Sequence, residues 1–485
     1  MCDSSTSNLS SRLFLEKRDK FRSQIRKDRN DQLFSQFRTK FLPPSKKFLC
    51  TTITSLFSSE ELTSLCNQFL FSYEQKDASL IISSLIALKD FLMITELSSE
   101  SKQFSHYGVN IPLNEILSNQ IDTSVCPEIM ESALYIYVIA MNPEKQDNNE
   151  SLISLELVAN LLHLLTNHQM DEKLFLIFEA LAASCVNDYF RDFIIKGDIV
   201  KKILDVLMGE LWMTDVMLLE SIIGLIRCLY IVKPGPVYDE MKYLTEPMLV
   251  LMIAIRNKNV VVDIMFILAN LSIGNHEYFV KECFQNDEIP NKILDFLRDP
   301  DENIVEAAID LVAALTFGGF EETYQLYERG IIPEIMKMIE KRIENGDIMN
   351  KALIIMGNFF DGEARHVEIG LKISGFFEKL LKANDYDYAT QTQIVNCLIN
   401  ATYVATNEQR NELMRLGLLN KILEILIRSE NEGDFVMTVL LGLENILKDE
   451  KIDQSGKIKE KLECLLSHYN ENVALIASKM ISEYF

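Results

Sequence analysis

The chain has 485 residues, which is too long for one ordinary hydrophobic core, so several domains or one repeat array are expected. Only 18 Gly and 11 Pro are present, which argues against sandwiches, barrels and Rossmann folds, because these need many turns. The formal net charge of −23 divides into +7 for residues 1–48 and −30 for residues 49–485. A segment as acidic as residues 49–485 repels nucleic acid and attracts basic protein segments.

A basic stripe lies within the first of the predicted elements. On a helix, Arg18, Arg22, Arg26 and Arg29 fall within about 80° of one another, and Lys27 follows Arg26 in the sequence. Three interpretations remain open for this arm: a solvated or disordered basic tail, a nuclear-localisation or nucleic-acid patch, and a helix held by an acidic partner. Pro43 and Pro44 then break the helical pattern, which places the boundary between an arm of residues 1–48 and a body of residues 49–485.

Adjacent pairs of long apolar residues recur along the body at steps of 42 or 45 positions. The pairs begin at Ile116, Leu161, Ile203, Met248, Ile293, Ile335, Leu380 and Ile422. A repeat of this length, rich in helix formers, is typical of the armadillo and HEAT class. The sequence therefore predicts an all-α superhelical solenoid of about ten repeats with a concave groove, preceded by a basic helical arm.

Motifs for catalysis or cofactors are not found in the sequence. It has no CxxC pair, no P-loop, no GxGxxG, GxSxG or HExxH, and its six histidines lack metal-ligand spacing. We therefore expect no enzyme activity, cofactor or metal. Scattered cysteines, no run of 18 apolar residues and no apolar signal core predict an intracellular protein without a membrane span.

The chain resembles the importin-alpha family of nuclear import adaptors. The stretches that carry the resemblance are IRKDRNDQLFSQFR (25–38), FRDFIIKGDI (190–199), KPGP (233–236), NLSIG (270–274), NFFDG (358–362), GLENILKDE (442–450) and ECLLSHYNENVALIASKMISEYF (463–485). The resemblance implies an armadillo solenoid whose groove binds basic localisation signals of protein cargo, and an arm that binds an importin-beta-like carrier. It also implies shuttling between cytoplasm and nucleus, with an export receptor at the C-terminal repeats as a further partner.

The resemblance assigns roles to particular residues. The carrier-binding residues would be Arg18, Arg22, Arg26, Lys27, Arg29 and Arg38. In the groove of such a family member, an Asn on each third helix bonds the backbone of the signal, and a Trp four residues earlier stacks on its lysines. Carried over, the groove residues would be Asp188, Phe266, Asn270, Asn358, Asn396 and Asn400. Helix C-caps remain the alternative for Asn270, Asn358 and Asn400, since a Gly follows the first two by four positions.

Several family positions are altered in this chain. The first three Trp/Asn pairs are Leu134/Val138, Ala180/Ser184 and Gly224/Cys228, and a fourth altered pair is Asp310/Ala314. Acids of the family are replaced by Lys351 and Gln393. Lost stacking costs about 0.5–2 kcal/mol per site and a lost Asn about 1 kcal/mol, so we expect conventional basic signals to bind poorly in the N-terminal half.

The arm also departs from the family. Importin-alpha ends its arm with a Lys-Arg-Arg run that occupies its own groove, whereas SQFRTK (35–40) carries only Arg38 and Lys40, so weak self-inhibition is expected. Two functions remain open: a divergent import adaptor, and an armadillo scaffold without an import role. The aligned arginines favour the adaptor, because a pure scaffold has no need of them.

Overall fold

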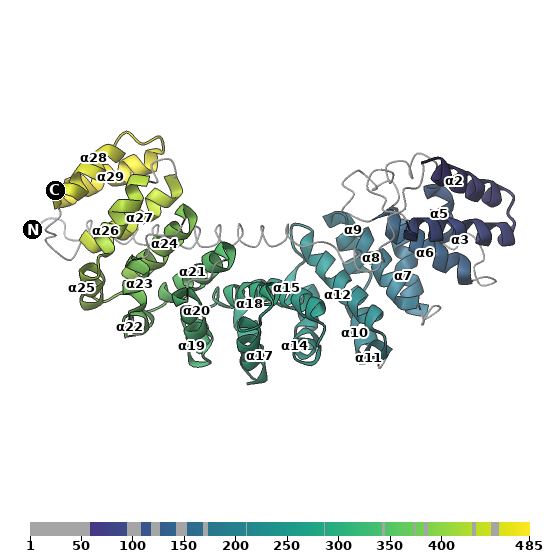
Figure 1. Ribbon diagram of the computed structural model, residues 1–485, viewed down its shortest axis with the longest axis horizontal. Coiled ribbons are helices and arrows are strands. Elements are labelled where there is room, and N and C mark those ends of the chain that lie inside the picture. The colour runs from purple at the N-terminus through teal and green to yellow at the C-terminus, as the bar shows by residue number, and fades with distance from the viewer. Residues whose placement is uncertain are drawn as a thin grey trace, which may run out of the picture. The chain divides into compact units, whose positions relative to one another are not determined.

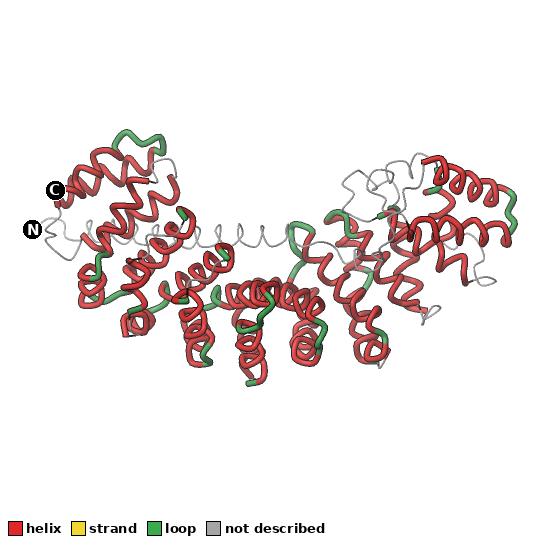
Figure 2. Tube along the Cα trace, in the orientation of Figure 1, coloured by secondary structure: helices red, strands yellow, loops and turns green. Residues whose placement is uncertain are grey.

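The structure is a computed structural model of the chain. It describes residues 59–94, 108–117, 127–141, 153–167, 173–209, 211–285, 287–341, 345–372, 375–382, 387–428, 433–447 and 455–485. These residues form helices joined by turns and loops and contain no strand (Figure 2). The basic arm, its six predicted carrier-binding residues and the predicted boundary after residue 48 all lie outside them.

The chain divides into two compact units, Met1–Pro236 and Val237–Phe485. The described helices of unit 1 are α2 (Ser59–Glu74), α3 (Ala78–Ile94), α5 (Asn110–Leu117), α6 (Pro127–Ala140), α7 (Leu155–Asn167), α8 (Leu174–Ser184), α9 (Asp188–Lys196), α10 (Ile199–Met208), α11 (Leu211–Thr214) and α12 (Val216–Ile231).

Unit 2 continues the same pattern of short helix, second helix and longer third helix (Figure 1). Its helices are α13 (Tyr238–Met241), the 3₁₀ turn η6 (Lys242–Leu244), α14 (Thr245–Ala254), α15 (Lys258–Gly274), α16 (His276–Gln285), α17 (Glu288–Leu297), α18 (Glu302–Leu315), α19 (Phe320–Glu328), α20 (Ile331–Glu340), α21 (Gly346–Phe360), α22 (Ala364–Lys372), α23 (Phe376–Lys382), α24 (Tyr388–Val404), α25 (Asn407–Arg415), α26 (Leu418–Arg428), α27 (Gly433–Leu447), α28 (Ser455–Leu465) and α29 (Glu471–Tyr484).

The repeating apolar pairs of the sequence all fall in second helices. They lie in α5, α7, α10, α14, α17, α20, α23 and α26. The first residue of each pair is buried; for example, Ile116, Ile293 and Ile422 are each 0% exposed. The pair recurs because every second helix must bury the same stripe against its own third helix and the neighbouring repeat.

Third helices pack against one another in chain order within each unit. In unit 1 these are α3, α6, α8 and α12, and in unit 2 they are α15, α18, α21, α24, α27 and α29. In unit 2 the second helix of each repeat packs on the back of its third helix, as α17 does on α18 and α20 on α21. Four and six third helices give ten, so the predicted array of about ten repeats is confirmed.

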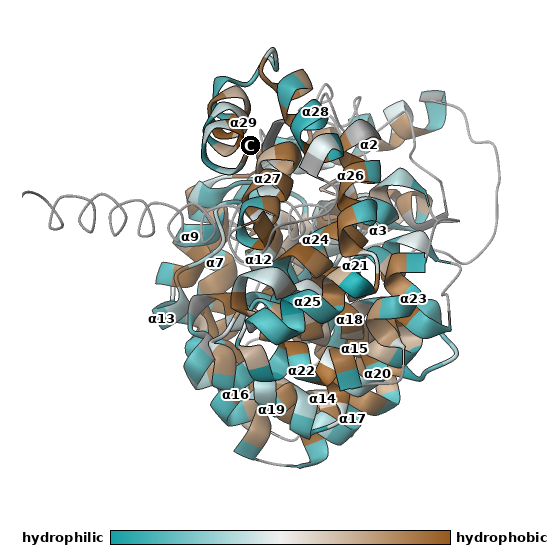
Figure 3. Ribbon diagram, turned by 90° about the vertical axis from the view of Figure 1, so that its left-hand side faces the viewer, coloured by the Kyte–Doolittle hydropathy of each residue, from teal (hydrophilic) through white to brown (hydrophobic). Residues whose placement is uncertain are grey.

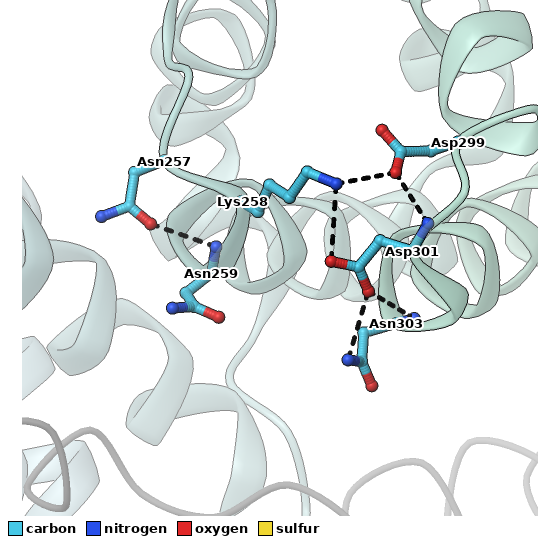
Figure 4. Close-up of polar contacts among 6 residues, drawn as sticks. All are labelled: Asn257, Lys258, Asn259, Asp299, Asp301 and Asn303. Carbon is cyan, nitrogen blue, oxygen red and sulfur yellow. Dashed lines mark hydrogen bonds and ion pairs between the residues drawn. The ribbon is translucent and has the colours of Figure 1, made fainter.

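Side-chain caps begin the third helices and join neighbouring repeats. Asn257 caps α15 and Asp301 caps α18, each accepting a hydrogen bond from the backbone N–H two residues later. Between these two caps, Nζ of Lys258 lies 2.8 Å from a carboxylate oxygen of Asp299 and 3.5 Å from one of Asp301 (Figure 4). Asp301 thus starts α18 and also pairs with Lys258 of the preceding repeat.

Two of the stretches quoted for the resemblance meet in unit 1. Arg191, from FRDFIIKGDI, is only 3% exposed, and its guanidinium donates hydrogen bonds to the carbonyl oxygens of Val232 and Pro234, at the start of KPGP. The same guanidinium pairs with Asp192 at 2.6 Å. These bonds fix the end of α12 to α9, so both stretches serve the packing of one repeat.

Candidate functional site

One surface of unit 2 is built by third helices α15, α18, α21 and α24. At about 100° per residue, six positions on each helix fall within a stripe about 100° wide. We call these positions the third-helix face. They are Asn259, Val262, Asp263, Phe266, Asn270 and Ile273 on α15; Asn303, Glu306, Ala307, Asp310, Ala314 and Phe317 on or just after α18; Asp347, Asn350, Lys351, Ile354, Asn358 and Asp361 on or just after α21; and Ala389, Thr392, Gln393, Asn396, Asn400 and Tyr403 on α24.

The third-helix face is the side of these helices that their own second helices leave uncovered. Second helices α14, α17 and α20 pack on the back, and neighbouring third helices cover the flanks. In Figure 1, α14, α17 and α19 lie below α15, α18 and α21. Figure 3 shows the polar first helix α25 mostly teal, whereas brown is prominent on α24 and α27. The face is most open at its edges: Asn259, Asn303 and Asp347 are exposed, and so is Ile273.

Acidic groups dominate the charge of the third-helix face. Its carboxylates belong to Asp263, Glu306, Asp310, Asp347 and Asp361, and its one basic group is Lys351. The formal charge of the face is therefore −4, and Lys351 already pairs with two of the carboxylates. A surface of this charge, with amides and apolar residues between the acids, can hold the backbone and the basic side chains of an extended segment.

Asn270, Asn358 and Asn400 lie on this face, inside their helices. The alternative of helix C-caps is therefore wrong, because α15, α21 and α24 continue beyond Asn270, Asn358 and Asn400. Their amide groups make defined bonds. Nδ2 of Asn270 donates to the carbonyl of Phe266 in its own helix at 2.8 Å.

The other two amides reach the neighbouring third helix. Nδ2 of Asn358 donates to Oγ1 of Thr316, just after α18, at 3.1 Å, and Nδ2 of Asn400 donates to the carbonyl of Gly357 in α21 at 3.0 Å. Asn358 is 7% exposed and Asn400 is half-buried. These two residues thus join successive repeats, and their bonding of a ligand backbone stays a prediction.

The remaining predicted groove residues occupy different places. Phe266 and Asn396 lie on the third-helix face and are 7% and 6% exposed. Asp188 lies in unit 1, exposed in the first turn of α9, where Asn187 caps the helix by accepting from the N–H of Phe190. Five of the six predicted residues are therefore on one face of unit 2, and Asp188 is not among them.

The sequence showed that Lys351 replaces an acidic residue of the family. It did not show the two residues that form ion pairs with this lysine. Nζ of Lys351 lies 2.7 Å from a carboxylate oxygen of Glu306 and 2.8 Å from one of Asp310, both on α18. Glu306 was not predicted as a site residue from the sequence. Its spacing could have indicated it, because it lies four residues before Asp310, on the same face of α18, and one 45-residue repeat step before Lys351.

Three of the altered Trp/Asn positions of unit 1 are fully buried. Leu134, Ala180 and Ser184 are each 0% exposed. The hydroxyl of Ser184 donates to the carbonyl of Ala180 and also bonds the hydroxyl of Tyr137 at 2.9 Å. These three positions therefore offer neither a charged group nor exposed surface to a ligand.

A buried carboxyl group lies between α8 and α12 of unit 1. Glu179 is 5% exposed, and its Oε1 has no hydrogen-bond partner among the described residues. Burial raises the pKa of Glu179 from the ordinary 4.5 to about 7, and the nearby carboxylate of Glu220 adds to the rise. The folded chain therefore binds this proton more tightly than the unfolded chain does.

We predict that Glu179→Gln stabilises the chain in a pH-dependent way. Ionisation of Glu179 costs folding free energy that begins above pH 4.5 and is fully present above about pH 7. Glu179→Gln should therefore raise the free energy of unfolding by about 1–3 kcal/mol at pH 8 and by much less at pH 5. Urea unfolding at both pH values measures this, with the exposed Glu74→Gln as control. An equal effect of Glu179→Gln at the two pH values would contradict the interpretation.

Metal and membrane sites were sought in the part of the chain that the structure describes. Within it, no three or more His, Cys, Asp or Glu side chains gather closely enough to hold a metal ion. None of the helices in the same part is both long and apolar enough to cross a membrane.

Comparison with known proteins gives one distant relative by sequence and a shared fold among solved structures. No family model matches the chain. Importin subunit alpha-8 of Arabidopsis thaliana is 21% identical over 269 residues, which are 56% of this chain and 58% of the plant protein. The chain therefore matches less than two thirds of that relative's length.

One solved structure shows the same architecture over most of the chain. An engineered protein matches with a TM-score of 0.69 at 17% identity, covering 87% of this chain and 98% of the engineered one. A designed armadillo repeat protein, covered to 98%, matches 49% of this chain at 18% identity with a TM-score of 0.42. The chain is an armadillo-repeat solenoid with weak similarity to an importin alpha.

Proposed function

We propose that the chain is a nuclear import adaptor that binds a basic segment of a protein cargo on the third-helix face of unit 2. The observation that carries this proposal is the charge of the face, where five carboxylates stand against one lysine that is already paired. A lysine or arginine of the ligand gains charge-assisted hydrogen bonds from such groups, and the amides of the face suit an extended backbone.

The body as a whole supports a basic ligand. Residues 49–485 carry 36 basic and 66 acidic side chains. Many of the basic ones are committed to bonds between repeats, as Arg329 is to Asp287, Arg365 to Glu321 and Lys379 to Glu340. The surplus acid attracts basic segments at long range, which raises their association rate at low ionic strength.

The adaptor role rests further on the basic arm. We propose that residues 12–40 bind an importin-beta-like carrier through Arg18, Arg22, Arg26, Lys27, Arg29 and Arg38. Their aligned charges and the similarity of the array to an importin alpha support this part of the proposal. In this role the chain would shuttle between cytoplasm and nucleus.

A pull-down with importin-beta separates the adaptor from a scaffold without an import role. We expect the full-length chain to be retained on immobilised importin-beta and a chain starting at Ser45 to lose at least 90% of that binding, because a stripe of four arginines is removed. A full-length variant with Arg18, Arg22, Arg26 and Arg29 changed to Glu should lose binding as well, whereas Lys46→Ala with Lys47→Ala should keep it. Equal retention with and without the arm, or no retention, would favour the scaffold.

A further inference from the structure

Lys351, a residue of the chain itself, occupies the third-helix face between α18 and α21. Lys351 projects from α21, and its ammonium lies 2.7 Å from Glu306 and 2.8 Å from Asp310 of α18. The side chains of Lys351 and Asp310 are 7% and 8% exposed, and that of Glu306 is 24% exposed. The contact spans two adjacent repeats and lies within the face proposed to bind a basic segment.

Glu306 and Asp310 together form a receptor for one ammonium group. They are four residues apart, so both carboxylates point to the same side of α18. Two carboxylates held this close and largely removed from water require a cation, because unpaired charges are costly at low exposure. The Nζ group of Lys351 supplies that cation from the neighbouring helix.

A lysine of a ligand would bring the same ammonium group to the same face. We propose that Lys351 is a specificity-determining residue that fills, from inside the chain, a site which would otherwise take a basic side chain of the ligand. This inference rests on the proposed binding of a basic segment to unit 2. At the step from α18 to α21, the natural ligand therefore presents a non-basic residue, and its lysines and arginines bind on either side.

The experiment tests the variant Lys351→Ala in the full-length chain, which removes the ammonium group that pairs with Glu306 and Asp310. The probe is a fluorescent peptide of eight alternating lysines and arginines, with a set of eight peptides that each carry one alanine. We expect Lys351→Ala to bind the parent peptide at least tenfold more tightly than the wild type does. The alanine series should show one position at which the variant loses this gain, and the wild type should not respond at that position.

Matched variants separate a local site from a general change in charge. Lys341→Ala removes the same charge at an exposed position at the end of α20 and should bind the peptide as the wild type does. Glu306→Gln with Asp310→Asn in the Lys351→Ala background should abolish the gain. The inference is overturned if folded Lys351→Ala binds within twofold of the wild type, or if Lys341→Ala gains as much.

A second readout does not depend on the peptide. Butylammonium, which resembles the end of a lysine side chain, should raise the Tm of Lys351→Ala but not that of the wild type, and absence of this difference also overturns the inference. If Lys351→Ala does not fold, the variant Glu306→Gln/Lys351→Ala keeps one carboxylate and takes both tests. A wild type that binds no basic peptide contradicts the proposed function, whereas a wild type that binds without any gain in the variant contradicts the role of Lys351 alone.

Discussion

Basic peptides should bind the chain much more weakly once Asp263, Asp347 and Asp361 are changed together to Asn. These acids lie at three places on the third-helix face, and none of them takes part in the Lys351 contact. Exposed or half-buried ion pairs contribute about 0.2–1 kcal/mol each, so three lost pairs cost about 0.6–3 kcal/mol. At 1.4 kcal/mol per factor of ten, we expect affinity to fall roughly 3- to 140-fold. Fluorescence anisotropy with the lysine-arginine peptide measures the change.

The control for this prediction removes three acids from the other side of the repeats. Glu277, Glu328 and Glu408 are exposed on first helices α16, α19 and α25, so changing them to Gln alters net charge by the same amount. This control should change affinity less than twofold at 0.15 M salt, where the Debye length is about 8 Å. Equal losses in both triple variants would show that binding depends on net charge and not on the third-helix face.

The second large effect concerns how closely third helices approach one another. A Cβ added at Gly442 of α27 would lie 2.5 Å from Cγ2 and 3.0 Å from Cγ1 of Ile399, which is 0% exposed in α24. Gly442→Ala must therefore push the two helices apart, and we expect it to lower the free energy of unfolding by about 1–3 kcal/mol. Thermal or urea unfolding measures the loss.

Gly357 offers a matched control on the opposite flank of the same helix α24. Its added Cβ would lie 3.5 Å from Nδ2 of Asn400 and 3.6 Å from Cα of Cys397, which are ordinary contacts. Alanine is favoured over glycine by about 1 kcal/mol inside a helix, so Gly357→Ala should be neutral or stabilising. If Gly442→Ala were as stable as Gly357→Ala, the packing described for α24 and α27 would be incorrect.

The repeat array could be predicted from the sequence because every repeat buries an apolar residue at the same position of its second helix. Each second helix needs a long apolar side chain at one position, and residues such as Ile203, Ile293 and Ile335 therefore recur at nearly constant spacing and are all fully buried. Helix boundaries follow from the same regularity, since Asn or Asp begins third helices at Asp215, Asn257, Asp301, Asn345 and Asp387.

The site could be predicted only in part because roles depend on partners in neighbouring repeats. Asn358 and Asn400 were assigned through the family resemblance, but their bonds to Thr316 and Gly357 depend on how adjacent helices pack. Lys351 was recognised as a changed charge, yet only the packing of α21 on α18 shows that Glu306 and Asp310 receive it. A pattern within one helix carries no information on which residue of the next helix lies opposite.

Photo-crosslinking of a basic peptide to the full-length chain tests the central claim most directly. The peptide of alternating lysines and arginines would carry a benzophenone at its centre, and mass spectrometry would locate the sites of attachment. We predict that crosslinks fall on α15, α18, α21 and α24, are lost in the Asp263/Asp347/Asp361 variant, and persist in the control with Glu277, Glu328 and Glu408 changed. Crosslinks on the third helices α6, α8 and α12 of unit 1, or an even spread over first helices, would contradict the proposed binding face.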